Sequence, residues 1–439
     1  MTGVENDTAQ ARPHDTTHMW RSILAAVIGN GLEFYDFLVY AFFAIQIGQA
    51  FFPSDDPFLS LMGSLGAFGA GFVSRPLGAW VLGTYADRHG RKPAMLISMV
   101  MMGAGIALLA LTPSYATIGL AAPVIAIAAR LIQGFALGGE VGSSMTFLVE
   151  AAPPHRRGLV ASLQGASQAI AATLGSTVGL VLSLMMGPAE LASYGWRVAL
   201  LLGTLIVPIA LFLRRTMPET MGHGTVEEPG AGEPGRGLSP LVRRVVVLGT
   251  VIMGARAITN YAFNYMATYG QSTLHLPAKA AMAGVLASNA TYFVAAMLGG
   301  WLSDRYGRRR VMIVPMAFYL LLIVPCFAWL TEARTMGVFI AANVILATFN
   351  YLNNGPIYAA IAESLPARMR ARGFSLIYSI PVSLLGGSTQ LMVAWVLHAT
   401  GNPMSVAWFL AAVCCAGLIA TALMRESAPG LARVARAVG

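Results

Sequence analysis

The chain has 439 residues, of which 56% are hydrophobic and only 11% are charged, and its mean hydropathy is +0.66. Soluble domains carry roughly 25% charged residues, so this composition excludes an ordinary soluble protein and predicts an all-α membrane protein. The net charge of +9 could indicate a nucleic-acid partner, but the basic residues gather in alternate loops, which favours a membrane topology signal and no nucleic acid.

Residues 1–20 are polar and contain no apolar signal-peptide core, so we expect a cytoplasmic N-terminal tail. Segments of about 20 apolar residues are long enough to cross a bilayer as helices, and the chain contains twelve of them. We expect transmembrane helices at 21–50, 58–86, 92–112, 117–149, 157–186, 194–214, 240–270, 280–303, 310–330, 335–362, 371–398 and 403–424.

The long hydrophilic interruption at 216–239 is rich in Gly, Pro and Glu and is typical of a flexible cytoplasmic linker. It divides the chain into two six-helix bundles around a central cavity, at 21–215 and 240–424, and a tail follows at 425–439. Most of the 28 Lys and Arg residues lie in loops on one side, whereas Lys279 and Arg334 fall clearly on the other. By the positive-inside rule, both termini are expected in the cytoplasm.

The two halves repeat each other. GTYADRHGRK at 83–92 and GWLSDRYGRR at 300–309 both lie between the second and third spans of their half. A second echo ends each fourth span, with Glu150 in EAAPPHRRG and Glu363 in ESLPARMRARG. The paired motifs lie at nearly the same separation, which indicates an internal duplication.

We expect the repeated motifs to form a gating latch that holds the halves together and breaks when they rock. Glycine lets helices approach closely, aspartate can pair with arginine or cap a neighbouring helix, and the basic residues anchor the loop. A topology signal alone would need only Arg and Lys. The latch residues are Gly83, Asp87, Arg88, Gly90, Arg91, Glu150, Gly300, Asp304, Arg305, Gly307, Arg308 and Glu363.

Five charged residues lie near the middle of four spans. They are Glu33 and Asp36 in the first span, and Arg75, Arg130 and Arg256 in the second, fourth and seventh. A charge at a helix centre costs roughly 2.5–3.5 kcal/mol or more unless it faces protein or water. We therefore expect the five to converge on one wet cavity, although Arg75 precedes a proline and a structural role stays open for it.

Polar side chains also recur at helical spacing in spans of both halves, as expected for an alternating-access site. Asn and Gln inside spans can instead simply bond one helix to another, for about 0.6 kcal/mol each. The candidate substrate-binding residues are Asn30, Tyr40, Arg75, Arg130, Gln133, Gln164, Gln168, Arg256, Asn260, Asn264, Asn289, Tyr292, Asn350, Asn354 and Tyr358.

The charge balance predicts the sign of the ligand. Three arginines face two acids, and protonating one acid leaves positive charge that an anion can neutralise. Because arginine matches carboxylates in bidentate geometry, we expect a di- or tricarboxylate on Arg130 and Arg256. Glu33 and Asp36 are the candidate proton carriers, because two ionised acids so close together repel each other.

The duplicated loop motif and the six-plus-six topology resemble the major facilitator superfamily. GNGLEFYDF at 29–37, SRPLGA at 74–79, RLIQGFALGGE at 130–140 and SLQGASQ at 162–168 resemble its metabolite:proton symporter branch, and most closely the citrate-proton symporters. The resemblance implies a monomer in the inner membrane that imports a citrate-like di- or tricarboxylate with protons by alternating access.

Other functions stay open at this point. The same branch contains proton symporters for betaine, shikimate or phthalate, and the superfamily contains drug/proton antiporters, which often carry a GP motif that span 5 lacks here. A membrane receptor or scaffold without flux would not need converging charges. No P-loop, HExxH motif or Cys/His cluster occurs in the sequence, so we expect no enzyme, cofactor or metal.

Overall fold

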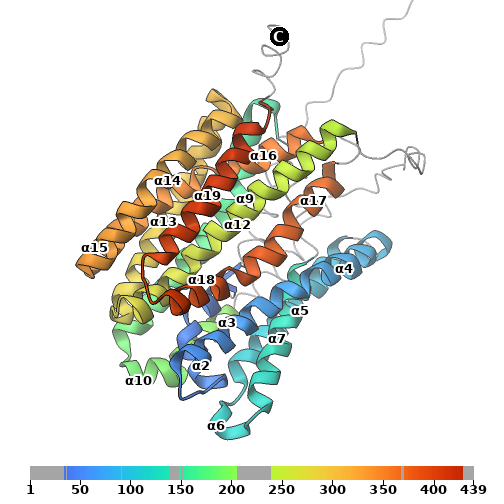
Figure 1. The fold of residues 1–439 in the computed structure, drawn as a ribbon. Helices are drawn as coiled ribbons and strands as arrows, with labels where there is room; N and C mark the ends of the chain where they lie inside the picture. Colours follow the sequence, from blue (N-terminus) through green and yellow to red (C-terminus); the bar gives the residue numbers. More distant parts are fainter. Residues whose placement is uncertain are drawn as a thin grey trace, which may run out of the picture.

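The computed structural model describes residues 34–35, 37–89, 91–138, 148–149, 152–204, 239–366 and 370–428. All of the elements in these ranges are helices, which confirms the expected all-α class. In Figure 1 the helices run side by side, with α2–α7 of the first half in the lower part of the view and α9 of the first half among the helices of the second half.

The first half begins with the helical residues 37–42. The elements that follow are α2 (Ala44–Phe51), α3 (Pro57–Val73), α4 (Arg75–His89), α5 (Arg91–Leu111), α6 (Tyr115–Ile118), α7 (Ala121–Leu137), η1 (Pro154–Arg156), α9 (Arg157–Met185), α10 (Pro188–Glu190) and η2 (Leu191–Gly195). Asp56 begins α3 by accepting a hydrogen bond from Phe58 N at 2.8 Å, and Pro57 occupies the first helical position.

The second half is described from residue 239 onward, with a gap at 367–369. Its elements are α12 (Pro240–Thr268), η3 (Tyr269–Thr273), α13 (Ala278–Tyr306), α14 (Arg308–Ala333), α15 (Met336–Tyr351), α16 (Asn354–Ser364), α17 (Arg370–Pro381), η5 (Val382–Gly386), α18 (Gly387–Thr400) and α19 (Ser405–Leu423).

Seven helical segments of the described residues are long and apolar enough to cross a membrane, and each falls on an expected span. They are Pro57–Leu82, Pro154–Met185, Ala278–Tyr306, Arg308–Ala333, Met336–Ser364, Gly373–Thr400 and Ser405–Leu423. Two shorter apolar helices, Leu96–Leu111 and Ala121–Leu137, fall on the third and fourth spans, and α12 falls on the seventh. Much of the first and sixth spans lies outside the described residues.

Several of the expected spans are interrupted within the described residues, and three of these breaks lie next to or within polar or proline-containing segments. Ser74 separates α3 from α4 directly before Arg75-Pro76, Leu352 and Asn353 separate α15 from α16, and the π-helical turn η5 follows Pro381. Proline removes a backbone donor and disturbs the preceding turn, and Ser74 Oγ instead donates to Leu131 O of α7 at 2.7 Å. These breaks place polar groups inside the bundle.

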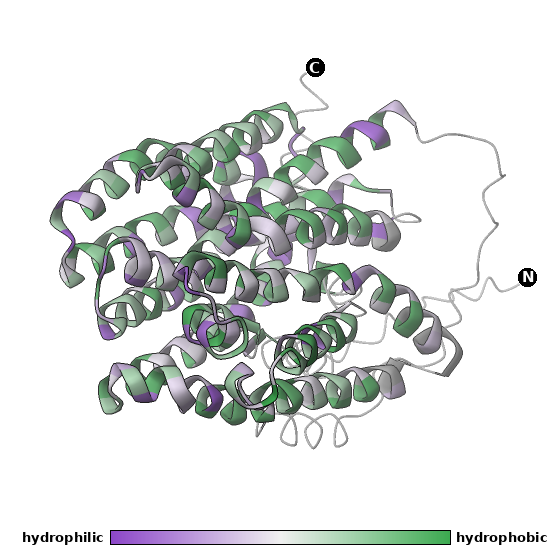
Figure 2. Cartoon of the chain, turned by 60° about the horizontal axis from the view of Figure 1, so that its bottom comes forward, coloured by the Kyte–Doolittle hydropathy of each residue, from purple (hydrophilic) through white to green (hydrophobic). Residues whose placement is uncertain are grey.

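The outer surface is apolar, as lipid requires. Hydrophobic residues cover most of each helix in Figure 2, and the hydrophilic ones are scattered or lie at the ends. Large side chains such as Trp80, Trp395 and Trp408 are exposed. In a bilayer such side chains need no protein partner, because lipid tails are as apolar as they are.

Small residues bring the helices close together. A Cβ added to Gly134 of α7 would lie 1.6 Å from Gly71 O of α3, so only glycine fits there. The two halves meet in the same way where α9 packs against α13 and α16 and where α3 packs against α18. Figure 1 shows α9 beside the second-half helices, which places the central site between the halves.

Candidate functional site

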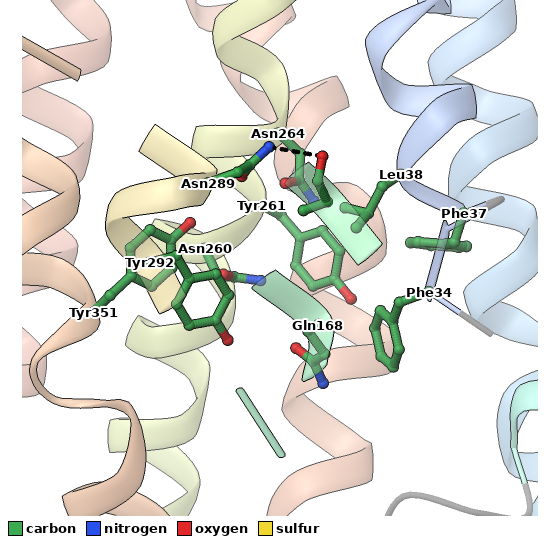
Figure 3. Close-up of a pocket in the computed structure, with 11 residues that line it drawn as sticks. Phe34, Phe37, Leu38, Gln168, Asn260, Tyr261, Asn264, Asn289, Tyr292 and Tyr351 are labelled. Carbon is green, nitrogen blue, oxygen red and sulfur yellow. Dashed lines mark hydrogen bonds between the residues drawn. The ribbon is translucent and has the colours of Figure 1, made fainter. Parts of the chain in front are cut away.

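A pocket of about 330 Å³ lies between the two halves (Figure 3). The first half contributes residues 34–38 and α9, and the second half contributes α12, α13 and α15. The lining residues are Phe34, Phe37, Leu38, Gln168, Ala172, Asn260, Tyr261, Asn264, Asn289, Tyr292 and Tyr351. Among these described residues the lining is aromatic and amide-rich, and it contains no charged side chain.

The amides of the pocket join the halves and leave donors for a ligand. Asn289 Nδ2 donates to Ala172 O at 3.2 Å, the dashed line in Figure 3, and to Ser176 Oγ at 3.3 Å. Asn264 Nδ2 is buried and has no hydrogen-bond partner within the described chain. Tyr292 and Tyr351 stack with ring centroids 3.8 Å apart and form one wall. A buried donor without an acceptor is costly, so the pocket suits an acceptor-rich ligand.

Arg130 of α7 is completely buried at the edge of the first half. Its Nη1 donates to Gln133 Oε1 at 2.6 Å. Its Cζ atom lies 4.5 Å from the ring centroid of Tyr40 and 4.7 Å from that of Phe37, which are cation–π distances. The Tyr40 hydroxyl donates to Ser64 O at 3.0 Å and is held in place by that bond.

Arg75, the first residue of α4, lies against the same phenylalanine. Its Cζ atom is 4.9 Å from the Phe37 centroid and 4.0 Å from that of Phe72. Its Nε and Nη2 atoms are buried without a hydrogen-bond partner in the described ranges. Phe37 also lines the pocket, so the structure brings Arg75 and Arg130 together behind one aromatic ring.

Arg256 of α12 reaches the pocket through two other side chains. Its Nη2 donates to Asn354 Oδ1 at 3.0 Å, and Asn354 Nδ2 donates to the Tyr292 hydroxyl at 3.0 Å. Its Cζ atom lies 5.2 Å from the ring centroid of Tyr351. A Cβ on Gly165 of α9 would lie 1.6 Å from Asn354 Nδ2, so this glycine makes room for the network.

The structure does not gather all candidate residues around one pocket. Gln168, Asn260, Asn264, Asn289 and Tyr292 line it, whereas Arg256 and Asn350 line a second cavity inside the second half. The predicted meeting of Arg130 and Arg256 at one pocket is therefore not seen in this conformation.

The remaining candidates lie elsewhere. Tyr358 packs against the rings of Phe374 and Tyr378, and Gln164 is buried within α9. Asn30, Glu33 and Asp36 lie outside the described residues.

The candidate latch of the second half forms one network at the start of α9. Asp304 accepts hydrogen bonds from Gly158 N and Leu159 N, both at 2.8 Å, and so caps a helix of the other half. Arg308 Nη1 pairs with Asp304 at 2.6 Å, and Arg308 Nη2 pairs with Glu363 at 3.0 Å. The aspartate therefore pairs with an arginine and caps a neighbouring helix at once.

The other latch candidates differ in their placement. Gly300 packs against Gly158, and Gly307 adopts φ 97° between α13 and α14, a conformation that favours glycine. Arg305 is exposed near the rings of Trp301 and Tyr306 and makes no contact within the described network. Gly90 and Glu150, and the side chains at Gly83, Asp87, Arg88 and Arg91, lie outside the described residues.

Sequence reasoning missed two groups of residues. Glu426, beyond the last span, accepts from Arg308 N at 2.9 Å and Arg309 N at 3.1 Å and so begins α14. The aromatic residues Phe37, Tyr261 and Tyr351 were not predicted, because the prediction depended on polar side chains at helical spacing. Tyr261 follows the candidate Asn260 directly in the sequence, and both line the pocket. An aromatic residue next to a row of polar residues was therefore the sequence feature that indicated this part of the lining.

Known proteins resemble this chain in sequence over most of its length. The model of the family described as "Major Facilitator Superfamily" matches residues 26–381. A citrate-proton symporter of Salmonella typhi is 34% identical and covers 92% of this chain and 93% of its own. An alpha-ketoglutarate permease of Escherichia coli K12 is 32% identical, with 95% and 96% covered. A proline/betaine transporter of Escherichia coli K12 is 29% identical, with 94% and 85% covered.

Solved structures show the same fold. A proton:xylose symporter superposes with a TM-score of 0.75 at 16% identity, covering 94% of this chain and 97% of the other. A fucose:proton symporter of Escherichia coli has a TM-score of 0.63 at 15% identity, with 92% and 98% covered. The family and the fold predicted from the sequence are confirmed by these matches, and with them the expectation of a membrane transporter rather than an enzyme.

Proposed function

Because this chain belongs to the major facilitator superfamily, we propose that it imports a small organic anion, a citrate-like di- or tricarboxylate, together with protons. The observation that carries the proposal is the pair of buried guanidinium groups, Arg75 and Arg130, that both lie against Phe37 at the pocket wall. Two fixed positive charges suit a ligand with several carboxylates. The identity to citrate-proton symporters over nearly the whole chain supports the same class of substrate.

In the proposed cycle, the ligand bridges the two halves. Its carboxylates bind Arg130 and Arg75 once Phe37 turns aside, and the unpartnered amide of Asn264 donates from the second half. Asn260, Asn289 and Gln168 complete the polar lining. A ligand that contacts both halves stabilises the closed arrangement, and this differential binding is what alternating access requires.

Glu33 and Asp36 carry the coupling proton in this proposal. Their described sequence neighbours Phe34 and Phe37 line the pocket. A carboxylate beside a buried arginine forms a strong pair when ionised. Protonation weakens that pair and leaves the guanidinium for the substrate, so proton and anion bind together.

The organisation of the chain is part of the same proposal. We take 21–215 and 240–424 as the two rocking bundles and 216–239 as their cytoplasmic linker, with the tails 1–20 and 425–439 on the same side. The network of Asp304, Arg308 and Glu363 acts as the latch at that side. The protein acts as a monomer in the inner membrane.

Uptake by purified protein in proteoliposomes tests the proposal. We expect citrate or α-ketoglutarate to accumulate when the outside is acidic, and a protonophore to abolish accumulation. In Glu33→Gln and Asp36→Asn, at least one variant should lose accumulation and keep substrate exchange, because exchange needs no net proton movement. Uptake that stays proton-driven in both variants would contradict the proton role, and binding without flux would indicate a receptor.

A second substrate class is favoured by one observation. The rings of Tyr261, Tyr292 and Tyr351 line the pocket, and aromatic rings bind quaternary ammonium groups by cation–π interaction. A zwitterion such as betaine is therefore the alternative, and it agrees with the similarity to proline/betaine transporters. A thermal-shift screen against carboxylates, betaine and aromatic acids distinguishes the classes, since stabilisation by zwitterions alone would replace the anion proposal.

A further inference from the structure

A second cavity, of about 260 Å³, lies wholly inside the second half. Its lining comes from α12, α14, α15, α16 and α19 and the residue before α16. The lining residues are Arg256, Thr259, Met316, Tyr319, Asn350, Asn353, Ile357 and Cys414. Tyr351 stands between this cavity and the central pocket, because it lines the pocket and its ring lies against Arg256. Figure 3 shows Tyr351 and Tyr292 at that wall.

The cavity holds a buried positive charge that has no counter-ion among the described residues. Arg256 is only 6% exposed, and its Nε and Nη1 atoms have no hydrogen-bond partner in that part of the chain. Its Nη2 atom bonds only the neutral amide of Asn354. No carboxylate of the described residues pairs with it, since the ion pairs there join Arg308 to Asp304 and Glu363. Arginine stays protonated in proteins, and an uncompensated buried charge is strongly destabilising.

A second donor belongs to the same cavity. Asn350 is 4% exposed, and its Nδ2 atom likewise has no acceptor within the described ranges. Met316, Ile357 and Cys414 supply an apolar remainder. The cavity therefore combines one full positive charge with unpartnered N–H groups from two helices, which is the chemistry of an anion site.

We propose that this cavity binds a small monovalent inorganic anion, of the halide class, as the counter-ion of Arg256. One guanidinium balances one negative charge. A di- or tricarboxylate would bring surplus negative charge into a space whose described lining has one charged side chain. A halide accepts hydrogen bonds from several directions and brings no charge beyond the one that balances Arg256. The inference goes beyond the proposed transport function, because the site differs from the substrate pocket.

The bound anion has a consequence for the central pocket. It fixes the guanidinium of Arg256, which holds Asn354, and Asn354 holds the hydroxyl of Tyr292. Tyr292 is part of the pocket wall. Halide occupancy therefore orders one wall of the substrate pocket without touching the substrate.

Thermal unfolding of the purified protein tests the site directly. In methanesulfonate buffer at constant ionic strength, without substrate or proton gradient, chloride and bromide should raise the unfolding midpoint saturably. Crystals soaked in bromide should show an anomalous peak beside Arg256 Nε. The absence of both effects would overturn the proposal, and stabilisation by citrate but not by halide would assign Arg256 to the substrate instead.

Two substitutions at one position sharpen the test. Asn350→Asp places a fixed carboxylate in the cavity, so the halide shift should vanish while stability in halide-free buffer equals or exceeds that of the wild type. Asn350→Leu removes one hydrogen-bond donor and keeps the charge of Arg256. The halide-induced rise of the unfolding midpoint should therefore persist but require higher halide concentrations. Equal shifts in both variants would contradict the site. Should a variant fail to fold, the bromide peak in the wild type decides, and neither readout depends on whether citrate is transported.

Discussion

Phe37 controls the chemistry of the pocket at the scale of single residues. Its ring lies between two guanidinium groups and the pocket, within 4.9 Å and 4.7 Å of the Cζ atoms of Arg75 and Arg130. Such a contact stabilises a desolvated cation by about 2 kcal/mol or more. The ring therefore stabilises both charges within an apolar wall, and in the proposed cycle an anion with stronger hydrogen bonds replaces it.

Replacing Arg130 by lysine tests this arrangement. Arg130→Lys keeps the charge and loses the planar fork that binds a carboxylate through two hydrogen bonds. Losing a charge-assisted bond of roughly 1.5–3 kcal/mol predicts a KM for uptake about 10-fold or more higher. The control is Arg334→Lys at the exposed end of α14, which should leave KM unchanged. A KM equal to wild type in both variants would remove Arg130 from the substrate site.

At the scale of elements, α9 is the helix on which the halves meet. Gly158 lies against Gly300 and Ser303, and Gly165 lies against Asn354. Small residues allow the backbones to approach closely and bury polar contacts between the halves. The helix thus couples the latch at its first turn to the arginine network two turns further along.

A methyl group at Gly165 should break that coupling. In Gly165→Ala the new Cβ would meet Asn354 Nδ2 at 1.6 Å, so Asn354 must leave Arg256 and Tyr292. We expect a folded protein with at least about tenfold slower uptake, since a charge-assisted hydrogen bond of roughly 1.5–3 kcal/mol is lost. Gly337→Ala is the matched control, because nothing lies within 4 Å of its Cβ and alanine favours a helix. Similar uptake rates in the two variants would disprove the role of the close contact.

At the scale of the whole molecule, the halves are joined at both ends of the bundle. Asp304 caps α9 at the end where α19 finishes (Figure 1). At the opposite end, Phe58 of α3 stacks on His398 of α18 with ring centroids 3.7 Å apart. A transporter that rocks between two states must break one of these contacts while it keeps the other.

Neutralising Asp304 should release the first of these ends. Asp304→Asn loses the ionic cap of α9 and the pair with Arg308, so spin labels at the exposed positions Arg156 and Tyr306 should shift to longer distances. Glu426→Gln is the control, because the hydrogen bonds of Glu426 within the described residues all go to the second half. Matching distance distributions in both variants would mean that Asp304 is not the latch.

The sequence alone predicted the all-α membrane fold and the family, which the comparisons confirm, while the twelve spans and the internal duplication stay predictions. These properties depend on local hydropathy and on motif spacing, which survive without knowledge of packing. The motif also predicted that Asp304 can pair with an arginine or cap a neighbouring helix, and the structure shows it doing both, with Arg308 of the same motif and with α9 of the other half.

Only the tertiary structure decided which buried groups face each other. Arg256 and Asn354 lie in different helices of the second half and bond each other, and the ring of Tyr351, which lines the central pocket, lies against Arg256. The sequence predicted that Arg256 and Arg130 lie at the same depth in the bilayer. Depth alone gives neither the rotation of each helix about its axis nor the identity of the side chains that lie between the two arginines. Those are set by close contacts such as Gly165 against Asn354. Packing between distant segments therefore placed Arg130 against Phe37, a residue of the central pocket, and Arg256 at a cavity inside the second half.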